Sequence, residues 1–208
     1  MHGVMTILSS IVLAACSVVG IRTGTEEPAY TVVDHVGELE IRQYAPRIAA
    51  ETVIEGQDPG QAIQTGFRRV AGYIFGGNKA KTKIAMTAPV AQSSEKIAMT
   101  APVAQARDAQ GRQLVRFFMP AEWTLATLPV PDDPSVHLVE VPAETMAVLR
   151  FTGSHSPDTL AERQAELLRL LGPSHFHADG PPVSWFYDPP WTLPWLRRNE
   201  VAVPVGSS

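Results

Sequence analysis

An aromatic cluster near the carboxyl end supplies the side chains best suited to hold a ligand. Three of the four tryptophans lie within residues 185–195, beside Phe186 and Tyr187. Aromatic faces stack on flat ligands and bury large areas. Arginines pair with carboxylates at the edges of such ligands, and those near the candidate walls are Arg68, Arg69, Arg197 and Arg198. The alternative is that the segment covers the core and carries surface arginines. The predicted wall residues are Phe67, Arg68, Arg69, Met86, Met99, Phe186, Tyr187, Trp191 and Arg197.

Catalytic and metal-binding motifs are absent from the sequence. It contains neither His-Glu-x-x-His nor Gly-x-Ser-x-Gly. His175 and His177 form the one close histidine pair, but glycines and prolines on both sides favour a loop. Two ligands alone seldom make a metal site. We therefore predict a binding protein that is not an enzyme and has no metal site of its own.

A repeated sequence marks the middle of the chain. The ten residues Lys-Ile-Ala-Met-Thr-Ala-Pro-Val-Ala-Gln occupy positions 83–92 and recur at 96–105. Their apolar residues alternate, which is the period of a strand with one apolar face. The polar linker between the copies favours a hairpin turn. The two copies are thus predicted to pair, with Met86 and Met99 on equivalent faces that line either the core or a ligand cavity.

Several motifs in this order resemble the SOUL or haem-binding-protein family. The resemblance covers roughly residues 28–205 and rests on segments 39–44, 62–67, 73–78, 83–90, 117–120 and 198–201. It implies a haem-binding domain. In the branch of the family with an axial histidine, that position is Gln43 here, so bound haem would lack a strong histidine ligand. Family positions that carry basic residues are Gln64, Gly72 and Thr192 in this chain.

The elements that must position these residues repeat once along the chain. Alternating segments 39–44 and 48–54 precede a helix that opens at Asp58-Pro59, and segments 136–141 and 146–151 precede a helix that opens at Ser156-Pro157. Asp or Ser caps a helix and proline fits its first position. Further strands follow each helix. We expect an α+β fold of two β-β-α-β-β halves. They form a distorted antiparallel barrel with two outer helices, as in effector-binding domains.

The amino-terminal segment resembles the signal peptide of a bacterial lipoprotein. Residues 4–13 are apolar but too short to span a membrane, and Leu-Ala-Ala precedes the single cysteine, Cys16. We predict a signal peptide at 1–16 with lipidation at Cys16, a tether at 17–28 and a SOUL-like domain at 29–208. Ser17, rather than aspartate, favours a periplasm-facing outer-membrane anchor in the cell envelope. An ordinary cleaved signal or a misplaced start codon is the alternative.

Composition limits the partners. A net charge of −4 and the absence of a basic run argue against nucleic acid. The leading hypothesis is an envelope-anchored carrier or buffer of haem or another tetrapyrrole. The alternatives are an effector-binding or protein-interaction barrel without haem affinity, and an enzyme that uses the same cleft.

Overall fold

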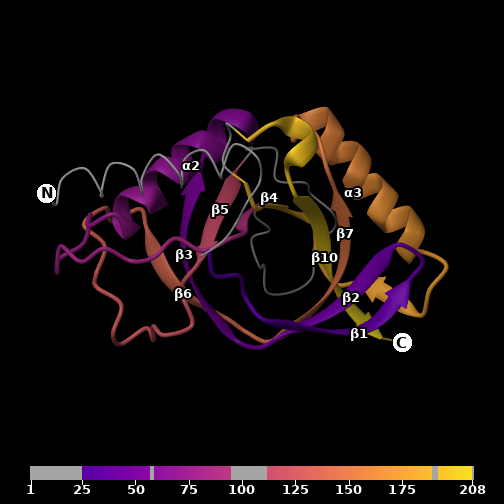
Figure 1. The fold of residues 1–208 in the computed structure, drawn as a ribbon, viewed down its shortest axis with the longest axis horizontal. Coiled ribbons are helices and arrows are strands. Elements are labelled where there is room, and N and C mark those ends of the chain that lie inside the picture. Colours follow the sequence, from indigo (N-terminus) through magenta and orange to yellow (C-terminus); the bar gives the residue numbers. More distant parts are fainter. Residues whose placement is uncertain (1–24, 57–58, 95–111, 189–191, 208) are drawn as a thin grey trace, which may run out of the picture.

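One curled antiparallel sheet of ten strands organises the chain, and its two long helices lie on the outside (Figure 1). The computed structural model describes residues 25–56, 59–94, 112–188 and 192–207. The helices are α2 (Pro59–Ile74) and α3 (Pro157–Leu171), with a short 3₁₀ helix η1 (Pro194–Leu196). The strands are β1 (Tyr30–Val36), β2 (Leu39–Tyr44), β3 (Arg47–Ile54), β4 (Val90–Ser94), β5 (Gln113–Phe118), β6 (His137–Val141), β7 (Glu144–Phe151), β8 (Phe176–Ala178), β9 (Val183–Phe186) and β10 (Asn199–Ser207).

The strand order relates the two halves by an approximate twofold arrangement. Along the sheet it is β1-β2-β7-β10-β9-β4-β5-β3-β6, with β8 paired to β10. Strand β2 of the first half pairs with β7 of the second, and β6 of the second half pairs with β3 of the first. The halves thus exchange one strand each and meet at the β4–β9 pair. The result is a half-barrel, which confirms the predicted fold.

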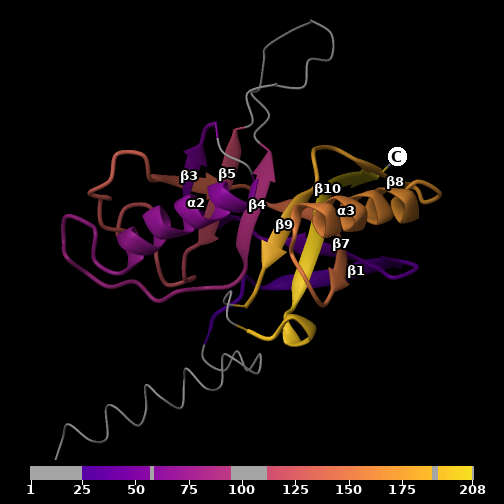
Figure 2. The ribbon, with the colours of Figure 1, turned by 90° about the horizontal axis from the view of Figure 1, so that it is seen from above.

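Each helix packs on its own pair of strands. Helix α2 lies over β3 and β5, and α3 lies over β7 and β10 (Figure 2). Helix α3 begins as predicted, because the Ser156 side chain accepts a hydrogen bond from the Thr159 backbone N–H. Helix α2 comes unusually close to the sheet at Gly66, where a Cβ atom would lie 2.5 Å from the Val115 side chain.

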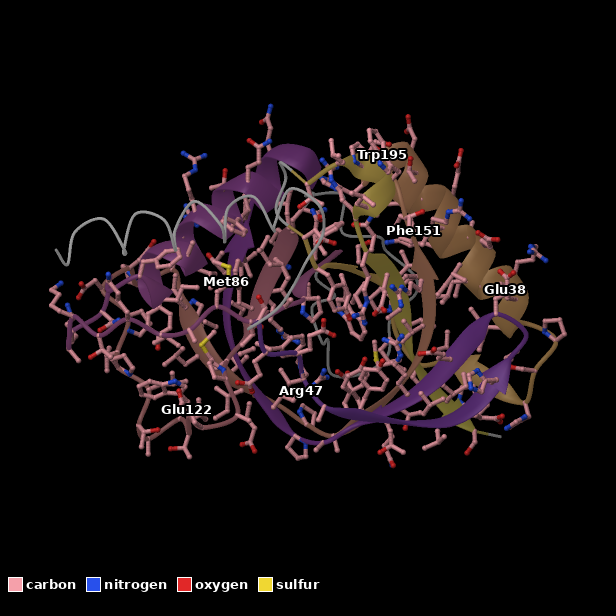
Figure 3. The ribbon with its side chains drawn as sticks, viewed as in Figure 1. Glu38, Arg47, Met86, Glu122, Phe151 and Trp195 are labelled. Atoms are coloured by element: carbon pink, nitrogen blue, oxygen red, sulfur yellow. The ribbon has the colours of Figure 1, made fainter. Side chains whose placement is uncertain are left out.

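Alternation along the strands divides the buried residues into three clusters. One lies between α2 and the sheet, and one lies between α3 and the sheet. The third lies on the opposite, concave face and includes Tyr44, Phe118, Trp185 and Tyr187. Side chains fill this interior (Figure 3). The concave cluster joins residues from both halves, so it is the part of the core where a shared site can form.

The prediction that the two copies of the repeat pair as a hairpin is wrong where the first copy can be checked. Strand pairing begins only at Val90, after Pro89, which has no N–H to donate to a ladder. Both edges of β4 are then taken, by β5 and β9. Ser93 and Ser94, predicted in the turn, are strand residues. The second copy, with Met99, lies outside the described residues.

Two further features concern the ends of the chain. Residues 176–178, expected in a loop, form strand β8 against the end of β10, so that expectation is wrong there.

Across the part of the chain that the structure describes, no helix is long and apolar enough to cross a membrane. The predicted signal peptide and Cys16 lie outside the described residues.

Candidate functional site

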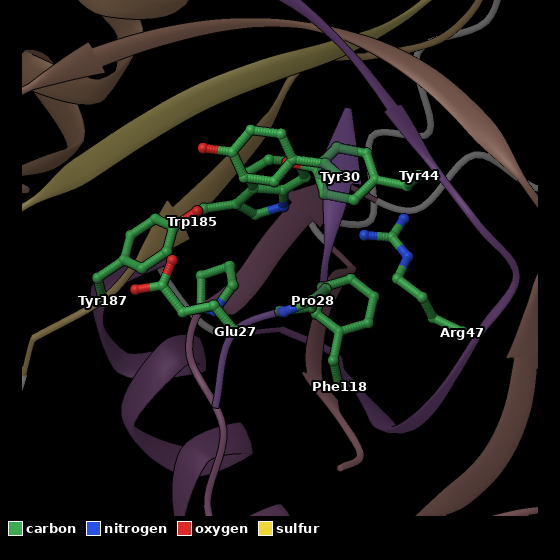
Figure 4. A pocket seen from close by; sticks show the side chains of 9 residues that line it. Glu27, Pro28, Tyr30, Tyr44, Arg47, Phe118, Trp185 and Tyr187 are labelled. Atoms are coloured by element: carbon green, nitrogen blue, oxygen red, sulfur yellow. The ribbon is translucent and has the colours of Figure 1, made fainter. Parts of the chain in front are cut away.

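A hollow of about 220 Å³, including its open mouth, lies on the concave face where the two halves meet (Figure 4). Much of this space is open to solvent, so the enclosed part falls far short of the roughly 300–1,000 Å³ typical of pockets that enclose a drug-sized ligand. The residues that line it are Glu27, Pro28, Tyr30, Tyr44, Arg47, Pro89, Phe118, Trp185 and Tyr187.

Aromatic rings from several strands form the walls. Tyr44 on β2 packs edge-on against Trp185 on β9, with ring centroids 5.7 Å apart and planes at 83°. The Tyr30 ring lies 5.4 Å from that of Tyr44. Phe118, at the end of β5 in the first half, also lines the hollow. Tyr44, Phe118 and Trp185 are only 2–3% exposed, and Arg47 lies over the rings of two of them, so a planar ligand would reach their apolar faces only when neighbouring side chains move.

Arg47 lies across the pocket from Glu27 and Tyr187 (Figure 4). Its guanidinium carbon is 4.3 Å from the Tyr44 ring centre and 4.4 Å from that of Phe118. It pairs with Glu144, while its buried Nε has no hydrogen-bond partner among the described residues. Burial lowers the pKa of Arg47, and Glu144 only partly offsets this. Arginine remains charged, so the pocket holds a cation with an unused donor.

A buried carboxylate lies behind the aromatic wall. Glu200 on β10 is fully buried. It accepts hydrogen bonds from Arg42 at 2.8 and 3.2 Å and from Arg198 at 2.9 and 3.1 Å. The Tyr187 hydroxyl donates to the same carboxylate at 2.6 Å. A buried charge requires such complete pairing. We call Arg42, Tyr187, Arg198 and Glu200 the buried ion network.

This network fixes the protonation states around the pocket. Burial raises the pKa of Glu200, but its bonds to Arg42 and the charges of Arg42 and Arg198 outweigh burial and leave that pKa below its ordinary value. Burial and the Glu200 charge raise the pKa of Tyr187. Burial also raises the pKa of Tyr44 to about 12. At neutral pH the carboxylate is therefore ionised and both phenols keep their protons.

A short segment before β1 forms one lip of the pocket. We call residues 25–29 the strap. Its Glu27 carboxylate accepts bonds from Arg198 at 3.0 and 3.2 Å, and Pro28 lines the hollow. Glu26 fixes the strap by its carbonyl, which accepts from the Ala88 N–H at 3.0 Å. Its carboxylate accepts from the Ala121 N–H at 2.8 Å.

The predicted site residues on the first half do not reach this pocket. Phe67 and Met86 pack against the cluster beneath α2, and Phe67 meets the Phe117 ring at 5.3 Å. Arg68 is exposed, and Arg69 lies 3.5 Å from the Thr52 hydroxyl. These four residues serve the outer face of the sheet, opposite the pocket.

The predicted residues of the second half divide between two places. Tyr187 lines the pocket. Phe186 and Arg197 instead both contact His155. The ring centres of Phe186 and His155 are 5.3 Å apart, and Arg197 Nη1 lies 3.4 Å from His155 Nδ1. Gln43 is exposed, and strand alternation places it on the face opposite Arg42 and Tyr44. Trp191 and Met99 lie outside the described residues.

Sequence reasoning missed most of the pocket, and of the buried ion network it named only Tyr187 and Arg198. Trp185 belonged to the aromatic cluster but was not chosen. A usable signal was alternation: Arg42 and Glu200 stand in strands whose other neighbours are largely apolar, which is unusual for charged residues. The ranges that the structure describes contain no group of three or more histidine, cysteine, aspartate or glutamate residues able to hold a metal ion.

Comparison with solved structures agrees on the half-barrel fold. The chain is similar to the C-terminal domain of EcmrR, with a TM-score of 0.56 and 10% identity over 86% of this chain and 99% of that domain. At that identity the likeness extends to the fold alone.

Sequence comparison identifies the family. The SOUL heme-binding protein model matches residues 25–204, and the chain belongs to this family. It is 30% identical to "Heme-binding protein 2" of Mus musculus over 65% of this chain and 62% of the mouse protein. It is 27% identical to "Heme-binding protein 1" of Xenopus tropicalis, over 78% of this chain and 81% of the frog protein. The match therefore spans less than two thirds of the mouse relative.

Proposed function

We propose that this protein binds a tetrapyrrole at the concave pocket and acts as a carrier or buffer, without catalysis. The observation that carries the proposal is the set of aromatic faces from both halves with Arg47 among them. Membership of the SOUL heme-binding family supports it. Because the hollow is small, a macrocycle would insert one edge and leave the rest outside, or displace the strap.

The side chains around the pocket suit the macrocycle better than its iron. The pocket lining contains no histidine, cysteine or methionine among the described residues. The phenols of Tyr44 and Tyr187 stay protonated, because their pKa values are raised. A protonated phenol is a poor iron ligand compared with imidazole or thiolate. Affinity then rests on stacking and on pairing of carboxylates with arginine, and haem would lack a strong axial ligand.

A titration of the purified full chain with haemin and with metal-free protoporphyrin IX tests this proposal. We expect saturable Soret shifts for both, with dissociation constants within about threefold of each other, since iron adds little to binding. Failure of both porphyrins to bind, with apolar dyes still bound, would favour the effector-binding alternative.

Two sets of variants locate the site. Arg47→Gln removes the pocket cation, and we expect about a five- to tenfold loss of affinity, as for a charge-assisted hydrogen bond. The control Arg68→Gln/Arg69→Gln alters the outer face of α2 and should change affinity less than twofold. Thermal unfolding confirms that each variant is folded. If the Arg68→Gln/Arg69→Gln variant loses affinity and Arg47→Gln does not, the binding site lies beside α2.

The cellular setting of the proposal rests on the sequence around Cys16. We propose that a lipid on Cys16 holds the protein at the periplasmic face of the cell envelope, in the outer membrane. Acyl chains contribute roughly 0.8 kcal/mol per buried CH₂, so diacylation gives stable anchoring. Mass spectrometry of the amino-terminal peptide and detergent partitioning test it. Cys16→Ser should give soluble or uncleaved protein, and an unmodified Cys16 would exclude the anchor.

A further inference from the structure

The strap places a carboxylate of the protein itself inside the candidate pocket. Glu27 lines the hollow and bonds to Arg198 through both carboxylate oxygens. The Arg198 side chain is 12% exposed and its guanidinium lies 3.8 Å from the Tyr187 ring centre. Arg198 Nη1 makes both bonds to Glu27, while Nε and Nη2 bond to Glu200. A guanidinium stacked on an aromatic ring is a common partner for a carboxylate. The position that Glu27 fills is therefore built for an acidic group.

We propose that Glu27 stands in for an acidic group of the ligand, and that a planar aromatic carboxylate binds by displacing Glu27 from Arg198. This rests on the proposed function and names the chemistry of its recognition. The ligand's carboxylate takes the place of Glu27 at Arg198 Nη1, its flat part lies against Trp185 and Tyr44, and Glu27 turns into solvent.

The exchange costs little, because one carboxylate replaces another. Arg198 keeps its bonds to Glu200 throughout, so no buried charge is left unpaired. The Glu27 side chain is already 30% exposed. Its bonds to Arg198, at 3.0 and 3.2 Å, are longer than the 2.7–2.9 Å usual for such pairs. Glu26 holds the strap independently, so Glu27 can leave without unfolding the segment.

The opposite side of the pocket offers a second polar contact. The Arg47 side chain is 9% exposed, and its buried Nε lacks a hydrogen-bond partner within the described chain. A buried donor without a partner is costly. A second acidic or carbonyl group on the ligand would satisfy it. A planar ligand with two acidic groups thus fits the pocket better than one with a single group.

The test compares acid and ester probes on matched variants of the full chain. The probes are protoporphyrin IX, its dimethyl ester and 2-naphthoate, each titrated by fluorescence. Glu27→Gln removes the competing charge and keeps the shape of the side chain. Glu38→Gln, in the exposed turn between β1 and β2, is the control for net charge. We expect Glu27→Gln to bind both acids about five- to tenfold more tightly, with ester binding unchanged.

Each outcome decides between the two proposals. Tighter binding of acids to Glu27→Gln alone supports the exchange at Arg198. Equal binding of acid and ester to wild type and Glu27→Gln overturns it and leaves tetrapyrrole binding intact. If 2-naphthoate responds to Glu27→Gln while neither porphyrin binds, the exchange stands and the tetrapyrrole proposal fails. If Glu38→Gln raises the affinity for the acids as much as Glu27→Gln does, the effect arises from net charge, and the proposed exchange is overturned.

Discussion

The two halves of the half-barrel both place ion pairs on the concave face, but they bury them to different depths. In the half that carries α3, Glu200 is fully buried and three residues donate to it, one of them Arg42 on the exchanged strand β2. In the half that carries α2, Glu51 on β3 pairs across the sheet with Arg116 on β5 at 2.7 Å. Their side chains are 17% and 25% exposed.

Because the two ion pairs differ in burial, we infer that similar strands have different roles in the two halves. A partly exposed pair such as Glu51–Arg116 can lose one partner to water at smaller cost than a fully buried carboxylate can. The buried ion network also borders the pocket through Tyr187, and its Arg198 bonds to the lining residue Glu27. The Glu51–Arg116 pair is absent from the lining. We infer that the α3 half is the rigid frame of the site.

The largest effect is expected when the shared carboxylate is neutralised. Glu200→Gln leaves Arg42 and Arg198 without their common anion and should cost about 3–5 kcal/mol of unfolding free energy. The equivalent change Glu51→Gln should cost about 1 kcal/mol or less. Urea denaturation of both variants measures the difference. Equal costs would remove the distinction between the halves.

A second contrast concerns two tryptophans of the same segment. Trp185 is 2% exposed and packs on Tyr44, so Trp185→Ala should cost about 3 kcal/mol and weaken porphyrin binding. Trp195 on η1 is 67% exposed, and Trp195→Ala should cost less than about 0.5 kcal/mol. Porphyrin titration and thermal unfolding provide both readouts. Loss of binding in Trp195→Ala alone would move the ligand to the outer surface near η1.

The fold was predictable because local signals agree with the global arrangement. The strand limits at residues 39–44 match β2, and the Ser156-Pro157 start matches α3. The exchange of β2 and β6 between halves was not predictable, because it depends on contacts remote in sequence. The repeated segment misled for a physical reason. Its alternation does not persist in the burial pattern, because Thr87, Ala88 and Val90 are all buried, and the segment joins a strand ladder only at Val90, after Pro89.

The chemical type of the site was predictable from the sequence, but its position in the fold was not. The sequence pointed to aromatic faces and arginines, and the pocket contains both. However, Phe67 and Arg69 were chosen from one face of α2, and that face packs on the outer side of the sheet. Which face of a curled sheet is concave depends on the packing of all the strands. Arg42 and Glu200 are 158 positions apart and meet only through the β2–β7–β10 order.

Helix packing offers a third test of the two halves. Gly66→Ala would force a Cβ to within 2.5 Å of Val115, and we expect a loss of about 1–3 kcal/mol from overpacking. Gly72→Ala, on the exposed side of α2 with open space around it, should gain about 0.5–1 kcal/mol from helix propensity. Thermal unfolding measures both. A stabilising Gly66→Ala would show that α2 can move away from the sheet.

The smallest effect we expect is a dependence on acid pH that arises from the α3 half. The pKa of folded Glu200 lies below its ordinary value of 4.5, so its contribution to stability is present above pH 4.5 and lost as pH falls through the folded pKa. His155 adds a milder loss below about pH 6.5, because burial and Arg197 lower its pKa and the unfolded chain takes up protons first. Urea denaturation between pH 7 and 3.5 should therefore show stability falling in two windows. Glu200→Gln should lose only the lower window and Glu51→Gln should keep both. If Glu51→Gln instead removes the lower window, the carboxylate that controls acid stability lies in the α2 half.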